Sequence, residues 1–96
     1  MKKRFIAKVK IFKRENGWYY VLVPTNLSKP LEIFADRKLI AVMAKVGKTS
    51  WPTSLLPMGD GTHFIALPLK VRVNENISLG TEIEVSFKLR IRASKY

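Results

Sequence analysis

The sequence predicts an all-β domain, a small barrel with at most short helical turns. Apolar and polar residues alternate with a period of two through most of the chain, and no segment shows a convincing helical period of 3.6. Glycine and proline separate the alternating stretches, as in small barrels. A chain of 96 residues, 47% of them hydrophobic, is expected to form one domain over residues 1–96 with one modest core.

The first half of the chain contains three predicted strands. In RFIAKVKIFK, residues 4–13, Phe5, Ala7, Val9 and Ile11 share one face and lysines lie on the other, which is the pattern of a half-buried strand. The Glu-Asn-Gly at 15–17 predicts a turn. The aromatic and branched stretch 18–24 predicts a second strand, and residues 38–46 predict a third that ends at Gly47.

The second half predicts three further strand segments. Residues 49–58, TSWPTSLLPM, contain Pro52 and Pro57, which cannot donate to a sheet, so we expect an edge strand or an irregular arm. The Gly-Asp-Gly at 59–61 predicts a hairpin turn, and a strand over 62–69 follows. The last strand covers 81–91, with Ile83, Val85, Phe87, Leu89 and Ile91 facing inward. A single turn of helix after Pro24 or Pro68 is compatible with the pattern.

Residues 17–43 and 61–87 align without a gap at an offset of 44 positions. Gly17 falls on Gly61 and Pro24 on Pro68. Farther on, Leu39, Ala41 and Met43 fall on Ile83, Val85 and Phe87. Because only three positions are identical, chance similarity between β segments is the alternative. The shared order of turn, strand, Pro and strand favours a duplicated ββ unit, and two such units can pair around a pseudo-twofold axis.

Composition argues against several classes of function. The chain has no cysteine and one histidine, too few ligands for a zinc site, so we expect no metal and no cofactor. No apolar run approaches the roughly 18–20 residues that cross a bilayer. The N-terminal stretch lacks the unbroken apolar core of a secretory signal. We therefore expect a cytoplasmic protein without a membrane partner.

The net charge of +11 comes entirely from the two ends of the chain. Residues 1–14 and 85–96 hold eleven basic residues and no acidic one, whereas seven basic residues balance seven acidic ones between them. Basic side chains alternate on one face of the last and first predicted strands: Lys88, Arg90 and Arg92, and Lys8 and Lys10. Residues on one strand face are about 6.6–6.8 Å apart, near the separation of phosphates along one nucleic-acid strand.

If the first and last strands are neighbours, their cations form a positive stripe suited to electrostatic binding of DNA or RNA. Phe12, Trp18 and Tyr19 could provide stacking faces for unpaired bases. The alternative is a solvated basic face that protects a sheet edge. We expect a non-enzymatic binding module, monomeric or homodimeric, with nucleic acid as its leading partner.

Catalysis is disfavoured although residues 50–63 contain Ser50, Thr53, Ser54, Asp60 and His63. A triad requires a defined geometry that proximity in sequence does not supply, so we expect no catalytic residue and no enzyme. The Gly-Asp-Gly is also too short for a phosphate loop. Because His63 follows a turn glycine by two residues, alternation could leave it exposed.

A ligand site is the alternative function. The candidates for an anion or ligand contact are Arg72, Lys70, His63 and Trp51, in a small-ligand or protein-interaction domain that uses the 49–61 arm and Arg72. For Arg72 the simpler interpretation is structural, with bonds to turn carbonyls or to Glu75 or Glu82. The aromatic residues at strand spacing, Trp18, Tyr20, Phe64 and Phe87, are expected in the core.

Three stretches carry a family resemblance: GWYYVLVP, TSLLPMGDGTHFIALPLKVR and LGTEIEVSFKL. Together they resemble the domain-of-unknown-function family numbered nineteen hundred and five, over about residues 5–89. The resemblance implies a double-split β-barrel related to AbrB-like and MazE-like proteins, which are dimers that bind DNA, and one chain with two units would mimic such a dimer. The second unit has Lys70 and Arg72 where the first has Asn26 and Ser28, which argues against a symmetric DNA site. The family implies no activity.

Overall fold

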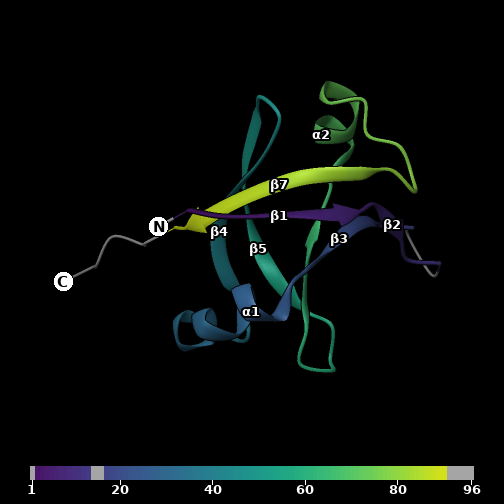
Figure 1. The fold of residues 1–96 in the computed structure, drawn as a ribbon. Helices are drawn as coiled ribbons and strands as arrows, with labels where there is room; N and C mark the ends of the chain where they lie inside the picture. The colour runs from purple at the N-terminus through teal and green to yellow at the C-terminus, as the bar shows by residue number, and fades with distance from the viewer. Residues whose placement is uncertain (1, 14–16, 91–96) are drawn as a thin grey trace.

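The strands form one antiparallel sheet that curls into a nearly closed barrel (Figure 1). The structure is a computed structural model that describes residues 2–13 and 17–90, and the strand order is β1-β7-β4-β5-β6-β3-β2. Its members are β1 (Lys2–Lys8), β2 (Lys10–Ile11), β3 (Tyr19–Val23), β4 (Ile40–Val46), β5 (Thr49–Pro57), β6 (His63–Ala66) and β7 (Glu82–Leu89). Only Val9 separates β1 from β2, the two ends of this order, so the sheet closes on itself. The predicted all-β barrel is confirmed.

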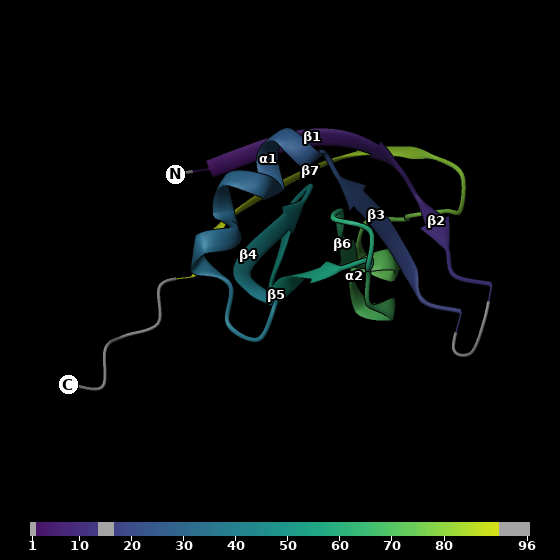
Figure 2. The same ribbon diagram turned by 90° about the horizontal axis from the view of Figure 1, so that it is seen from below.

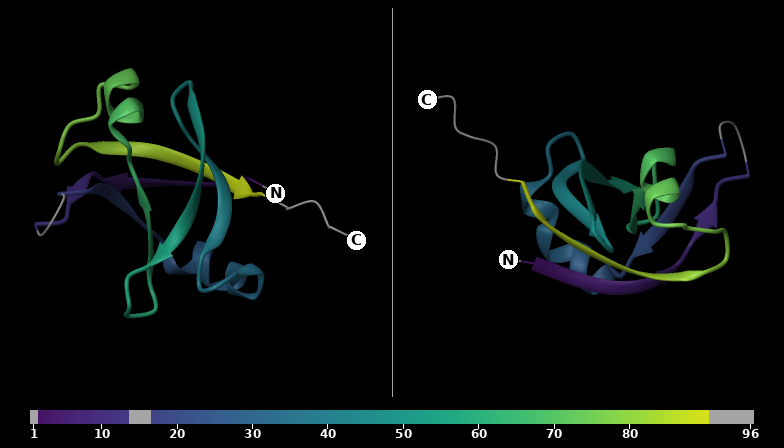
Figure 3. Two further views of the ribbon diagram at one scale, coloured as in Figure 1. Left: turned by 180° about the vertical axis from the view of Figure 1, so that it is seen from behind. Right: turned by 90° about the horizontal axis from the view of Figure 1, so that it is seen from above.

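Short helices follow both prolines for which a helical turn was expected. After Pro24, α1 (Thr25–Ser28) continues into the 3-10 helix η1 (Lys29–Phe34), and α2 (Leu69–Asn74) follows Pro68. The backbone at both prolines is extended, with ψ of 137° and 158°, so each strand ends before its helix begins. The two helical segments lie at opposite ends of the barrel (Figure 3). Among the described helices, none has the length and apolarity that crossing a membrane requires.

The core fills the inside of the barrel, mostly with the inward residues of the alternating strands, and Leu31 of η1 joins it. It comprises Phe5, Val9, Val21, Val23, Leu31, Ile40, Val42, Ala44, Val46, Leu55, Ile65, Leu67, Val85 and Phe87. Phe5 and Phe87 pack edge to face across the β1–β7 pair, with ring centroids 6.2 Å apart. Burying one such side chain contributes about 1.5–3 kcal/mol relative to exposure. The alternation in the sequence thus defines the barrel interior.

A second aromatic cluster covers the outer face of β3 and β6. Phe12 stacks on Tyr20 with centroids 4.0 Å apart, and Phe64 meets both rings edge to face. Tyr20 and Phe64 are buried by this packing rather than by the barrel interior. The expectation that Trp18 is a core residue was wrong. Trp18 lies just before β3, and its side chain is 49% exposed.

In the two sequence repeats, aligned residues of β3 and β6 face the same side of the sheet. Aligned residues of β4 and β7 face opposite sides, because the alignment is off by one residue there. Ala41 and Met43 lie on the outer face of β4, whereas the residues aligned with them, Val85 and Phe87, are buried. A shift of one residue moves a strand's side chains to the other face, so the two halves correspond only if a one-residue gap precedes β4. The ungapped alignment therefore fails after the helices.

β5 is an edge strand along most of its length, as its prolines predicted. It pairs with β4 from Thr49 to Leu55, but with β6 only at Leu56 and Pro57. Pro52 lies within the stretch that is paired on one side only. Its missing N–H therefore costs the sheet no hydrogen bond. Seen from below, β4 and β5 form a hairpin beside β6 (Figure 2).

Candidate functional site

The first and last strands lie side by side and pair antiparallel along β1. Lys2 is opposite Lys88 at one end of this pair and Lys8 is opposite Glu82 at the other. The first and last strands are therefore neighbours, which a shared charged surface requires. The register, which sequence alone did not supply, determines which charges meet. It places Lys88 and Lys8 at opposite ends of the strand pair, six residues apart along β1.

A compact group of four exposed cations lies on the outer face of β1, β7 and β4, and we call it the basic face: Lys2, Arg4, Lys45 and Lys88. Lys2 is directly opposite Lys88, and Ser86 on β7 lies between Arg4 on β1 and Lys45 on β4. Because neighbouring strands are about 4.7–4.9 Å apart, the backbones at Arg4 and Lys45 are separated by about 10 Å. Of the four, only Lys88 was among the predicted site residues, because the grouping of Lys2, Arg4 and Lys45 with it depends on pairing between distant strands.

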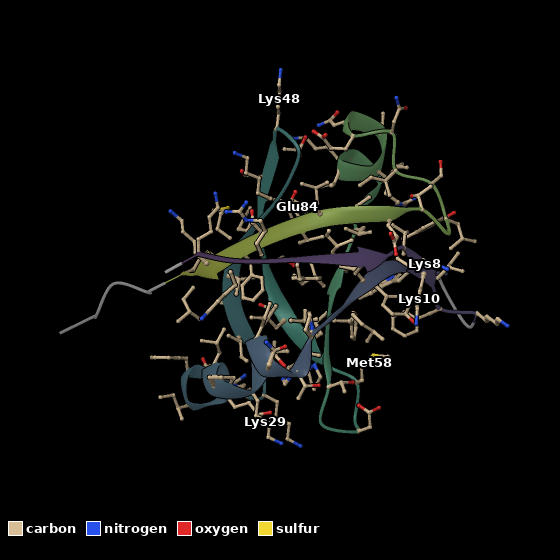
Figure 4. The ribbon with its side chains drawn as sticks, viewed as in Figure 1. Lys8, Lys10, Lys29, Lys48, Met58 and Glu84 are labelled. Carbon is tan, nitrogen blue, oxygen red and sulfur yellow. The ribbon has the colours of Figure 1, made fainter. Side chains whose placement is uncertain are left out.

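Two glutamates bound the basic face toward the start of β7. Glu84 Oε2 lies 3.5 Å from Arg4 Nη1, and both side chains are largely exposed, so this ion pair contributes only about 0–1 kcal/mol. Glu82 lies opposite Lys8. Figure 4 shows Glu84 near the middle of β7, and Lys8 and Lys10 toward the end at which β7 begins. The predicted continuous stripe is thus divided into the basic face and a separate Lys8–Lys10 group.

Arg90 is directed at backbone carbonyls and does not continue the solvent-facing row of Lys88. Its Nε donates to the Val42 carbonyl and its Nη2 to the Thr53 carbonyl, both at 2.9 Å, and the side chain is half-buried. It borders a hollow of about 710 Å³ that Phe34 and Leu39 also line. Strand alternation did not reveal this role, because a long guanidinium side chain can reach a neighbouring strand. Arg92 lies outside the described residues.

Arg72 is held in place by a carbonyl and an aromatic ring. Its Nε donates to the Leu67 carbonyl at 3.0 Å, and the guanidinium carbon lies 4.0 Å from the centroid of the Tyr19 ring. The expected bond from Arg72 to a backbone carbonyl is present at Leu67. Glu75 is engaged elsewhere, because its carboxylate accepts from the Lys48 backbone N–H at 3.3 Å and the Thr49 hydroxyl at 2.5 Å. The contact with Tyr19 was not predicted from the sequence.

His63 is buried, so the expectation of an exposed side chain was wrong. It is 5% exposed because it shares the inward phase of Ile65, and β6 places it between Val23 on β3 and Pro57 on β5. Its Nδ1 is buried and has no hydrogen-bond partner among the described residues. It lines a hollow of about 370 Å³ next to the Gly59–Gly61 turn.

The remaining ligand candidates do not converge on Arg72. Arg72 lines a hollow of about 360 Å³, and this hollow is distinct from the one that His63 and the 57–61 turn line. Trp51 packs against the core from β5, and its buried Nε1 has no partner in the described part of the chain. Lys70 is exposed on α2. A single site built from the 49–61 arm and Arg72 is therefore not formed.

The Gly-Asp-Gly segment is a hairpin turn stabilised within itself. Gly59 and Gly61 have φ of 98° and 94°, values that favour glycine. The Asp60 carboxylate accepts from the Thr62 hydroxyl at 2.5 Å and the Thr62 backbone N–H at 3.0 Å, and these bonds lower the pKa of Asp60 below its ordinary value. Asp60 is thus engaged by Thr62 and does not orient His63. Within residues 2–13 and 17–90, no group of three or more His, Asp or Glu side chains could hold a metal ion.

Fold and surface together define a small antiparallel barrel whose outer face carries clustered cations. The chain belongs to the family described as a domain of unknown function (DUF1905), whose model matches residues 5–87. No curated protein is significantly similar to the chain. The matched span begins after Arg4 and ends before Lys88, so three of the four cations of the basic face lie outside it. The family match therefore describes the scaffold more than the charged surface.

Proposed function

We propose that this protein is a non-enzymatic nucleic-acid-binding module whose basic face contacts phosphate groups. The observation that carries the proposal is the position of Lys2 directly opposite Lys88. Like charges at directly opposite positions destabilise an antiparallel pair. A phosphate bound between the two ammonium groups removes this repulsion, so the arrangement suits an anionic partner.

The spacing and the freedom of the cations support the same partner. Lys2 and Arg4 are about 6.6–6.8 Å apart along β1, a separation suited to consecutive phosphates. In the described part of the chain, Lys2, Lys45 and Lys88 form no ion pair, and the pair between Arg4 and Glu84 is weak because it is exposed. The net charge of +11 adds long-range attraction that speeds the encounter with a polyanion.

The resemblance to the swapped-hairpin barrels of AbrB-like and MazE-like proteins also supports this proposal. Those proteins are dimers that bind DNA, and a single chain containing two units provides a comparable barrel. In this chain, however, Arg72 of the second unit has Ser28 as its counterpart in the first. We therefore propose phosphate-driven binding with little dependence on base sequence, rather than a symmetric base-reading site.

A pair of charge reversals tests whether the basic face is the contact surface. Lys88→Glu and Lys29→Glu change the net charge equally, but Lys29 lies on η1, away from β7 (Figure 4). At about 50 mM salt, where phosphate-driven binding is strong, Lys88→Glu is expected to weaken duplex DNA binding several-fold more than Lys29→Glu. Loss of one phosphate contact should also reduce the salt slope by about one. Equal effects of the two variants, measured by fluorescence anisotropy, would contradict the proposal.

A further inference from the structure

A hollow of about 360 Å³ lies where β3 begins and β6 runs into α2. Its walls include Trp18, Tyr19, Pro68, Leu69 and Arg72. The volume is within the range of roughly 300–1,000 Å³ that is usual for sites of small molecules. The lining is mostly apolar and aromatic, and it contains one cation.

The guanidinium of Arg72 is fixed before any ligand arrives. The Leu67 carbonyl occupies its Nε, and the Tyr19 ring lies 4.0 Å from the guanidinium carbon. Its two terminal nitrogens have no acceptor among the described residues, so they remain available as donors. A planar guanidinium held in this way suits bidentate binding of a phosphate, and little side-chain freedom is lost on binding.

Trp18 is the stacking surface that remains open among the three aromatic residues considered for that role. Phe12 is stacked against Tyr20, and the ring of Tyr19 is covered by Arg72. Trp18 is 49% exposed and lines the hollow together with Arg72. An aromatic face beside a fixed cation matches the two parts of a nucleotide, its base and its phosphate.

The strand next to this hollow carries further positive charge. β2 pairs with β3, and the Phe12 N–H donates to the Trp18 carbonyl at 2.9 Å. Lys10 and Lys13 are exposed on the two sides of this contact in sequence. Because β2 pairs with β3, the two lysines add positive charge on and just after the strand that neighbours the hollow, which favours an anionic ligand.

We propose that this hollow is a subsite for one unpaired nucleotide, with its base stacked on Trp18 and its phosphate bound by Arg72. The inference rests on the proposed nucleic-acid function and specifies its substrate class as single-stranded nucleic acid. Bases within a duplex are stacked on one another and cannot present a face to Trp18. The basic face binds either form, and the subsite supplies the preference for the single strand.

Paired binding measurements with a single-stranded oligonucleotide of about ten nucleotides and the matching duplex test this subsite, since single-strand modules cover roughly 4–16 nucleotides. Trp18→Ala is expected to weaken single-strand binding by roughly five- to a hundred-fold and to leave duplex binding unchanged. Trp18→Phe should retain most of the affinity, because it keeps an aromatic face. Ile33→Ala is the matched control, because Ile33 is 84% exposed on η1 at the other end of the barrel.

Two further measurements keep the test independent of folding defects. In a Trp51→Phe background, Trp18 is the remaining tryptophan, so its fluorescence should be quenched when the single strand binds. Arg72→Lys retains the charge but loses the planar fork, and should reduce the preference for single strand over duplex. Equal affinity for both forms, together with Trp18→Ala behaving like Ile33→Ala, would overturn the subsite and leave the proposed function standing. Absence of binding to either nucleic acid would overturn both.

Discussion

Arg72 and Arg90 each use the guanidinium to satisfy backbone carbonyls. Arg72 bonds to Leu67 within the connection from β6 to α2, and Arg90 joins the end of β7 to Val42 on β4 and Thr53 on β5. Lysine could not reproduce both contacts of Arg90, because an ammonium group lacks the planar fork that directs two donors at once. Lys88, two residues before Arg90, is exposed instead, so neighbouring cations at the end of β7 have different surroundings.

Replacement of Arg90 is expected to destabilise the barrel. Arg90→Ala removes two hydrogen bonds from a charged donor and leaves the Val42 and Thr53 carbonyls without these partners, so the free energy of unfolding should fall by about 1–3 kcal/mol. Arg90→Lys should recover only part of this loss. Urea unfolding measures both changes, with Lys88→Ala as the control at an exposed site. If Arg90→Ala were as stable as Lys88→Ala, the two carbonyl contacts would contribute nothing.

At the level of elements, the β4–β5 turn is tied to the end of α2 by Glu75. The Glu75 carboxylate accepts from the Lys48 N–H and the Thr49 hydroxyl, so the hairpin tip is fixed against the helix. Gly47 in this turn has φ of 58°, and a Cβ atom there would collide with the Glu75 carboxylate. The positive φ therefore favours glycine at this position, and any larger residue would also displace the Glu75 side chain from its hydrogen bonds.

Gly47→Ala should lower the free energy of unfolding by more than its positive φ alone would explain. Gly17 is a matched control, because its φ of 61° is nearly the same and the nearest atom to a Cβ there is 3.6 Å away. An alanine in this conformation costs about 1–2 kcal/mol at either position, and at Gly47 the displaced Glu75 adds the loss of its hydrogen bonds. The free energy of unfolding of the two variants, measured in urea, should therefore differ. Equal destabilisation would show that the Glu75 contact is unimportant.

Alternation in the sequence was sufficient to predict the strands but not their partners. The strands from β3 to β7 lie within the predicted stretches, because inward and outward residues differ in polarity along each one. The one-residue phase difference between β4 and β7 escaped detection, because both faces of β4 carry apolar residues such as Val42 and Met43. Whether Lys88 meets Lys2 or Lys8 depends on register between the two ends of the chain, which local pattern does not encode.

The candidate site was predicted less completely than the fold, because its residues come together through strand pairing that local sequence does not encode. The basic end strands were recognised as a surface, but Lys45 joins the basic face through β4 from the middle of the chain. Trp18 was assigned to the core because aromatic residues in a strand pattern are usually buried, whereas it precedes β3 and borders a hollow. The contact between Tyr19 and Arg72 joins residues that are far apart in the sequence, so no local sequence pattern could predict it.

At the scale of the whole molecule, scaffold and charge are distributed differently along the chain. The DUF1905 match covers residues 5–87, and thus nearly the whole barrel. The charge excess is carried by residues 1–14 and 85–96. Within these segments, β1 and β7 lie side by side because they pair along Lys2–Lys8. A neutral scaffold with basic terminal strands thereby presents a charged face without placing cations in its core.

The salt dependence of duplex DNA binding by the unaltered protein tests the central claim most directly. If the four cations of the basic face each neutralise one phosphate, a plot of log affinity against log salt concentration should have a slope of roughly −3 to −4, since each contact contributes about −0.9. Fluorescence anisotropy over a salt series starting near 50 mM measures this slope. A slope near zero, or no binding at the lowest salt, would contradict phosphate recognition by the basic face.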